Sequence, residues 1–125
     1  MYLSAESIGE MILTDIAMHP GVSRAKLVND FSTFNSWLAT TFDSNVDNLI
    51  KLFLDVGIIR YVSYERKPMY SDSLLISSKH LAYVLRMTKI KQNLHEIQMY
   101  DAKCRYDSIV QSDSMYRWEQ SKKDV

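Results

Sequence analysis

Residues 46–59 read VDNLIKLFLDVGII, and this stretch decides the fold. Its apolar side chains recur three and four positions apart, the spacing of one buried helix face. The members of that face are Val46, Leu49, Ile50, Phe53 and Leu54. Gly57 predicts the end of the helix, because glycine readily adopts the left-handed conformation that follows many last helical turns. The stretch therefore predicts a helix that leads directly into a new element.

The residues after Gly57 alternate as strand residues do. Ile58 to Tyr64 is β-branched and aromatic, which is typical of a half-buried strand. Residues 65–68 form a charged turn, and residues 69–76 return as a second strand rich in leucine and isoleucine. The sequence therefore predicts a β-hairpin whose tip carries Arg66 and Lys67.

Three helices are predicted before residue 46. The first runs from Ser4 or Ala5 to Met18, with Ser4 as its N-cap. Ser23 is a second N-cap, and a short third helix covers about residues 33–42. Either Asp43 or Ser44 is expected to cap the helix that follows.

A long helix is predicted after the hairpin, capped by Ser77 or Ser78. Its apolar side chains alternate steps of four and three, which is typical of a coiled-coil seam. The seam consists of Tyr83, Met87, Ile90, Leu94, Ile97 and Cys104, and Asp101 interrupts it. It either joins two copies of the chain or packs on the domain's own core. Residues 112–125 are polar and are predicted to form a frayed tail.

Composition and length indicate one soluble domain. The 125 residues suit a single hydrophobic core, and 3 Gly and 2 Pro favour long helices over a many-stranded sheet. The single cysteine excludes an internal disulfide, so a reducing, cytoplasmic setting is expected. The apolar runs are shorter than the roughly 18 residues that a membrane span requires.

The charges balance overall but not locally. Fifteen basic and fifteen acidic side chains give a net charge of zero, which argues against a general electrostatic attraction to nucleic acid. Residues 60–93, however, hold seven basic side chains against two acidic ones. The basic excess therefore lies in the hairpin and the start of the last helix.

The element order resembles the winged helix-turn-helix superfamily of transcriptional regulators. In that family the helix before the hairpin usually ends in Leu-x-x-x-Gly-Leu/Ile-Ile, which Phe53, Gly57, Ile58 and Ile59 match loosely. The resemblance covers about residues 5–90. It implies a mainly α fold with a small β-hairpin, a core at 1–77 and a wing at about 58–76. The helix at 78–111 resembles the dimerisation helix of MarR- or PadR-like members by position.

The resemblance also implies a function. A recognition helix at about 45–56 would enter the major groove of double-stranded DNA, and the wing would touch its backbone or minor groove. The DNA-facing side chains carried over by position are Asn45, Asn48, Lys51, Arg60, Tyr64, Arg66 and Lys67, with Tyr70 as a further wing candidate. The expected protein is a homodimeric, sequence-specific DNA-binding regulator.

Two features depart from this pattern. Asp47 and Asp55 outnumber Lys51 on the recognition helix, although a helix in the groove usually gains from positive charge. Residues 32–44 are also longer than a simple turn, so residues 34–42 could themselves be the recognition helix.

The alternative is a winged-helix module that binds proteins, with Trp37, Tyr116 and Trp118 as aromatic anchors. Arg66 and Lys67 would then be ordinary solvated turn residues. The bias toward Tyr, Ser, Met and Asn suggests a viral or mobile-element source. The sequence contains no phosphate-binding loop, metal-ligand spacing or nucleophile elbow, so no enzyme activity, metal or cofactor is predicted.

Overall fold

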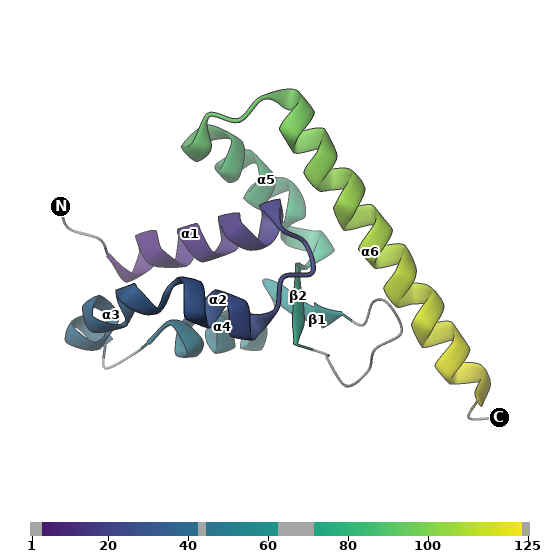
Figure 1. Cartoon of the computed structure of the whole chain (residues 1–125), viewed down its shortest axis with the longest axis horizontal. Helices are drawn as coiled ribbons and strands as arrows, with labels where there is room; N and C mark the ends of the chain where they lie inside the picture. Colours follow the sequence, from purple (N-terminus) through teal and green to yellow (C-terminus); the bar gives the residue numbers. More distant parts are fainter. Residues whose placement is uncertain (1–3, 43–44, 63–71, 124–125) are drawn as a thin grey trace.

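The computed structural model of the chain describes residues 4–42, 45–62 and 72–123. These residues form a mainly helical protein with one small antiparallel sheet, as the sequence predicts (Figure 1). The helices are α1 (Ala5–Met18), α2 (Arg24–Asp30), the 3₁₀ turn η1 (Ser32–Phe34), α3 (Asn35–Phe42), α4 (Val46–Asp55), α5 (Ser78–Gln92) and α6 (Glu96–Lys123). The strands are β1 (Ile59–Val62) and β2 (Ser73–Ile76).

Side-chain caps start three of the helices. Ser4 and Ser23 cap α1 and α2 as predicted, each accepting a hydrogen bond from the backbone N–H three residues later. The cap of α4 is Asn45, which accepts from the Asn48 N–H at 2.8 Å. The expectation of Asp43 or Ser44 is therefore wrong. Asn, Asp and Ser cap helices almost equally well, so residue type alone does not choose among three neighbours.

The end of α4 follows the prediction. Gly57 has a φ of 81°, and the Ile58 N–H donates to the Phe53 carbonyl at 3.0 Å. This bond closes the last turn in the Schellman pattern that a left-handed residue allows. Val46 and Ile50 are buried, and Phe53 packs against the core from its edge. α4 therefore ends before Gly57, as the glycine predicts, and β1 begins two residues after this glycine.

The sheet has a third segment beside its two strands. β1 and β2 are antiparallel, with Ile59 opposite Ile76. On the other edge of β2, the Leu74 N–H donates to the Val22 carbonyl at 2.8 Å, and its carbonyl accepts from the Gly21 N–H at 2.9 Å. Ser23 forms a bridge with Ser73 in the same place. β2 therefore lies between β1 and the segment that links α1 to α2, a pairing the sequence did not predict.

The core surrounds α1. Figure 1 shows α1 between α5 on one side and the group α2–α4 on the other. Ile8, Ile12 and Ile16 are fully buried at helical spacing along α1. Leu74 and Leu75 bring the sheet to the same cluster. One contiguous core thus holds the helices and the sheet together.

The predicted long helix after the sheet is wrong, because two helices occupy the region. Asn93 takes a left-handed conformation with a φ of 49° and ends α5. The Leu94 N–H closes this end on the Lys89 carbonyl at 3.2 Å, and the His95 N–H then donates to the Gln98 side chain at 3.0 Å to open α6. Asparagine tolerates the left-handed region better than most residues, so it allows the break.

α6 also extends further than expected. It is helical to Lys123, across the stretch predicted as a frayed tail. The helix lies against α1 and β1, and its far end projects past the sheet (Figure 1). The Tyr106 hydroxyl donates to the Ile76 carbonyl at 2.9 Å, and Arg105 donates to the Met18 carbonyl at 3.2 Å. Polar contacts of α6 to the ends of β2 and α1 therefore fix its position.

Candidate nucleic-acid interface

The candidate interface is the outward face of α4 together with the start of α2 and β1. α4 is strongly one-sided, because Val46 and Ile50 point into the core while Asn48, Lys51 and Leu52 are exposed. Asn45 satisfies a free backbone N–H in the first turn of α4, and the polar side chains of this turn remain exposed. This face is therefore available for contact with another molecule.

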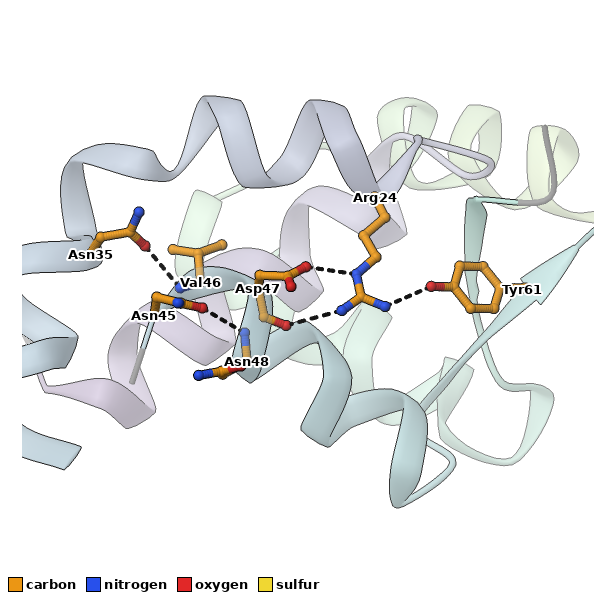
Figure 2. Close-up of polar contacts among 7 residues, drawn as sticks. All are labelled: Arg24, Asn35, Asn45, Val46, Asp47, Asn48 and Tyr61. Carbon is orange, nitrogen blue, oxygen red and sulfur yellow. Dashed lines mark hydrogen bonds and ion pairs between the residues drawn. The ribbon is translucent and has the colours of Figure 1, made fainter. Parts of the chain in front are cut away.

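Arg24 joins the three elements of this face. Figure 2 shows its guanidinium between Asp47 of α4 and Tyr61 of β1. The Nε atom lies 2.8 Å from the Asp47 carboxylate, and Nη1 donates to the Tyr61 hydroxyl at 2.7 Å. A longer contact of 3.4 Å joins Nη2 to the Asp47 carbonyl. Hydrogen bonding to Asp47 raises the pKa of Arg24, so this cation remains charged and paired.

The same network sets the start of α4. The Asn35 side-chain oxygen accepts from the Val46 N–H at 2.9 Å, so α3 supplies a second cap beside Asn45 (Figure 2). The first turn of α4 is thereby bonded to α2 and α3, and Arg24 links it in turn to Tyr61 of β1. These contacts tie α4 to the first strand of the predicted wing.

The residues predicted to contact DNA do not all lie on the same surface. Asn48 and Lys51 are exposed on one face of α4, as expected, and Asn45 lies at its start, where its side-chain oxygen serves as the cap. Arg60 instead forms an ion pair with Asp113 of α6 at 3.2 Å, so its guanidinium is engaged within the domain. The buried Asp113 carboxylate requires a cationic partner, which explains this placement. Tyr64, Arg66, Lys67 and Tyr70 lie outside the described residues.

The charge of this face is nearly balanced. Among the described residues of α2 and α4, Arg24 pairs with Asp47, and Lys26 pairs with Asp30 at 2.6 Å. Both pairs are solvent-accessible; the Arg24–Asp47 pair links α2 to α4, whereas the Lys26–Asp30 pair lies within α2. The excess of acidic groups expected on α4 is thus partly neutralised from α2. Within α4, Lys51 is the side chain whose positive charge balances the negative charge of Asp55.

Sequence reasoning missed Arg24 and Tyr61. Arg24 follows the N-cap Ser23 directly, and nothing local indicates that its partner is Asp47. Tyr61 belongs to the strand pattern, which identifies its exposure but not its hydrogen bond. Only the packing of α2 beside α4 brings these groups together.

The predicted seam is spread over two helices. Tyr83 and Ile90 are exposed on α5, and Ile97 and Cys104 are exposed on α6. Met87 and Leu94 are half-buried. The side of α6 that covers the core instead carries Ala102, Tyr106, Ile109 and Asp113. The exposed members of the seam therefore do not pack on the domain's own core.

The predicted aromatic anchors are partly accessible. Trp37 on α3 and Trp118 on α6 are exposed in part, whereas the side chain of Tyr116 lies outside the described part of the chain. Trp37 belongs to α3 and Trp118 to the last turns of α6. Figure 1 shows α3 and the C-terminal end of α6 on opposite sides of the molecule, so the two tryptophans do not form one patch.

Comparisons with known proteins identify no relative: no family model, curated protein or solved structure matches the chain. Within the described residues no three His, Cys, Asp or Glu side chains group as metal ligands would. None of the described helices is both long and apolar enough to cross a bilayer.

Proposed function

We propose that this chain is a winged-helix protein that binds duplex DNA through the outward face of α4. The observation that carries the proposal is the order of elements around the sheet. The segment at residues 21–24 pairs with β2, α2 and α4 follow it, and β1 returns beside β2. This is the arrangement expected of a winged helix, in which the helix before the hairpin is the recognition helix.

The side chains on that face suit the role. Asn48 offers an amide that can pair with adenine, and Lys51 offers a cation for guanine or a phosphate. Both are exposed on neighbouring turns of α4. Arg24 links α4 to Tyr61 of β1, so the proposed recognition helix is tied to the first strand of the predicted wing.

The proposal includes two copies of the chain. Ile90 and Ile97 are large apolar side chains left exposed in a single copy. Burying them against a second copy would remove apolar surface from water. Two recognition helices would also double the number of phosphate contacts, which compensates for the balanced charge of one face.

Binding of the purified protein to a mixed-sequence duplex across a salt series tests the proposal. Fluorescence anisotropy should show binding that weakens steeply with salt, while light scattering gives the mass in the same buffers. Lys51→Ala should weaken binding and make the salt dependence shallower by about one ion per copy. Lys103→Ala is the matched control, because Lys103 is an exposed, paired lysine on α6. Absence of binding at low salt would overturn the proposal.

A protein-binding module is the second candidate. Leu52 is 52% exposed and Val56 is 58% exposed on α4, where a groove-reading helix normally carries polar groups. If the chain is such a module, the exposed face of α4 contacts a protein and duplex DNA is not bound. Leu52→Ser and Val56→Ser should then abolish capture of that partner from source cells, while Met115→Ser on α6 leaves it unchanged.

A further inference from the structure

A hollow between α1, α3, α4 and α5 lies apart from the Arg24 network. Its volume is about 540 Å³, within the range of about 300–1,000 Å³ typical of sites for drug-sized ligands. The residues that line it include Gly9, Leu13, Leu38, Leu52, Phe53 and Met87. Most of them are apolar, so the hollow suits a ligand with an apolar body.

Gly9 gives the hollow its shape. A Cβ at this position would lie 3.0 Å from the Phe53 Cζ atom, so the absent side chain lets the Phe53 ring approach α1. Glycine inside a helix is less stable than alanine, so its place in the middle of α1 has a packing reason. Phe53 of α4 lines the hollow together with Tyr83 and Met87 of α5.

The charged groups at the hollow carry one sign. Among the described residues lining it, the charged side chains are Glu6 and Glu10. Glu10 forms an ion pair with Lys91 of α5, which does not line the hollow. This pair leaves the Glu6 carboxylate as the main uncompensated charge of the lining. A cation is therefore attracted and an anion repelled.

The aromatic side chains in the lining favour the same ligand. Cations bind over the faces of Tyr and Phe rings, and methionine adapts its shape to an apolar guest. Tyr83 and Phe53 supply such rings beside Met87. We infer that the hollow is a binding site for a small organic cation with an apolar body. The inference does not depend on DNA binding.

NMR of the methionine methyl groups in the full chain tests this site. The probe is 4-phenylbutylamine, which is protonated at neutral pH, and 5-phenylpentanoate is the matched anion. The amine should shift the Met87 methyl signal with a Kd of about a millimolar, as expected for a ligand of this size. Met115, on α6, is the internal control and should not move. The anion should bind about tenfold more weakly.

Two variants separate charge from fold. Glu6→Gln should weaken the amine about two- to fivefold, and Asp101→Asn, an exposed carboxylate on α6, should have no effect. Leu52→Lys places a cation at the hollow and should abolish the preference for the amine. Val56→Lys is its control, since Val56 is equally exposed on α4 but does not line the hollow.

The contrary results are specific. Equal shifts with the amine and the anion, or no Met87 shift at several millimolar amine, would overturn the inference. So would a Met87 signal that responds to protein concentration alone, because a second copy would then occupy the hollow. All of these readings are made without DNA, so a failure of DNA binding does not affect them.

Discussion

Asp113 of α6 lies 3.2 Å from Arg60 of β1, although 53 residues separate them in the sequence. The Asp113 side chain is only 4% exposed, and Arg117 on the next turn of α6 approaches it at 3.1 Å. A buried carboxylate is tolerated only when cationic or hydrogen-bonding groups satisfy it. The long C-terminal helix is therefore docked by a charged contact as well as by apolar packing.

Replacing Asp113 with alanine should destabilise the protein by about 1–3 kcal/mol. The change leaves the partly buried Arg60 without its carboxylate partner and loosens α6 from β1. Urea unfolding followed by circular dichroism measures this loss. Asp107→Ala is the control, because Asp107 forms an exposed pair with Lys103 on the same helix and should cost less than about 0.5 kcal/mol. Equal losses in the two variants would refute the docking role of Asp113.

Tyr106→Phe should lower the free energy of unfolding by about 1–2 kcal/mol at neutral pH, because the buried Ile76 carbonyl loses its hydrogen bond. Burial raises the pKa of Tyr106 above its usual value. The unfolded chain therefore ionises this tyrosine first, and the stability it contributes is lost as the pH rises above about 10. Urea titrations should show the gap between wild type and variant narrowing above that pH.

Tyr100→Phe provides the comparison for this prediction. Tyr100 is exposed on the same helix, so its replacement should leave the unfolding midpoint unchanged at neutral pH. A gap between wild type and Tyr106→Phe that stays constant to high pH would show that the hydroxyl is not buried in solution.

The left-handed residue between α5 and α6 gives a third prediction. Asn93→Gly should be neutral or mildly stabilising, whereas Asn93→Val should cost about 1–2 kcal/mol, because a β-branched residue is strained at a φ of 49°. Gln92→Val, one residue earlier in α5, is the control for β-propensity. Thermal unfolding measures both. A valine that is tolerated at Asn93 would mean that the two helices are continuous.

Self-association is tested at exposed apolar positions. Ile97 is 75% exposed, so Ile97→Asp should convert a dimer into a folded monomer without loss of helical content. Ile90→Asp on α5 should do the same if both helices contribute. Size-exclusion chromatography with light scattering gives the mass, and Leu52→Asp on α4 controls for a general effect of added charge. A wild-type monomer, or variants that remain dimeric, would contradict the predicted interface.

The negative charge of Asp47 on α4 predicts the direction in which duplex affinity changes when it is removed. Asp47→Asn removes a negative charge from the proposed DNA face, so duplex affinity at low salt should rise about two- to fivefold. Arg24 keeps its hydrogen bond to Tyr61, so the fold should persist. Asp101→Asn on α6 is the control and should leave affinity unchanged. Weaker binding by Asp47→Asn would indicate that this carboxylate positions Arg24 and is needed for that reason.

Most of the fold could be predicted because its signals are local. Ser4 and Ser23 cap helices through their own neighbours, and Gly57 ends α4 through its own backbone conformation. The break at Asn93 also had local signals, namely an asparagine followed by leucine and a Gln98 that can cap a new helix. The apolar spacing across 83–104 hid these signals, because apolar side chains keep steps of three and four residues on both sides of the turn at Asn93.

The candidate interface could be predicted only in part. Asn48 and Lys51 lie on the exposed side of α4 because the buried side is identified by apolar spacing, and such spacing is a property of the sequence. The engagement of Arg60 by Asp113 could not be predicted, since an arginine on a strand has no local preference among distant carboxylates.

The local sequence was enough to predict both ends of α1, the start of α2, the end of α4 and the apolar side of α4. These features depend on interactions within a few residues, which periodicity and capping report. Three features depend on tertiary packing instead. Residues 21–24 pair with β2, and Arg24 bridges Asp47 and Tyr61. On α6, Tyr106 faces inward and Ile97 faces outward. Those choices depend on which elements meet in space, and the free energy of such contacts is shared among residues far apart in the chain.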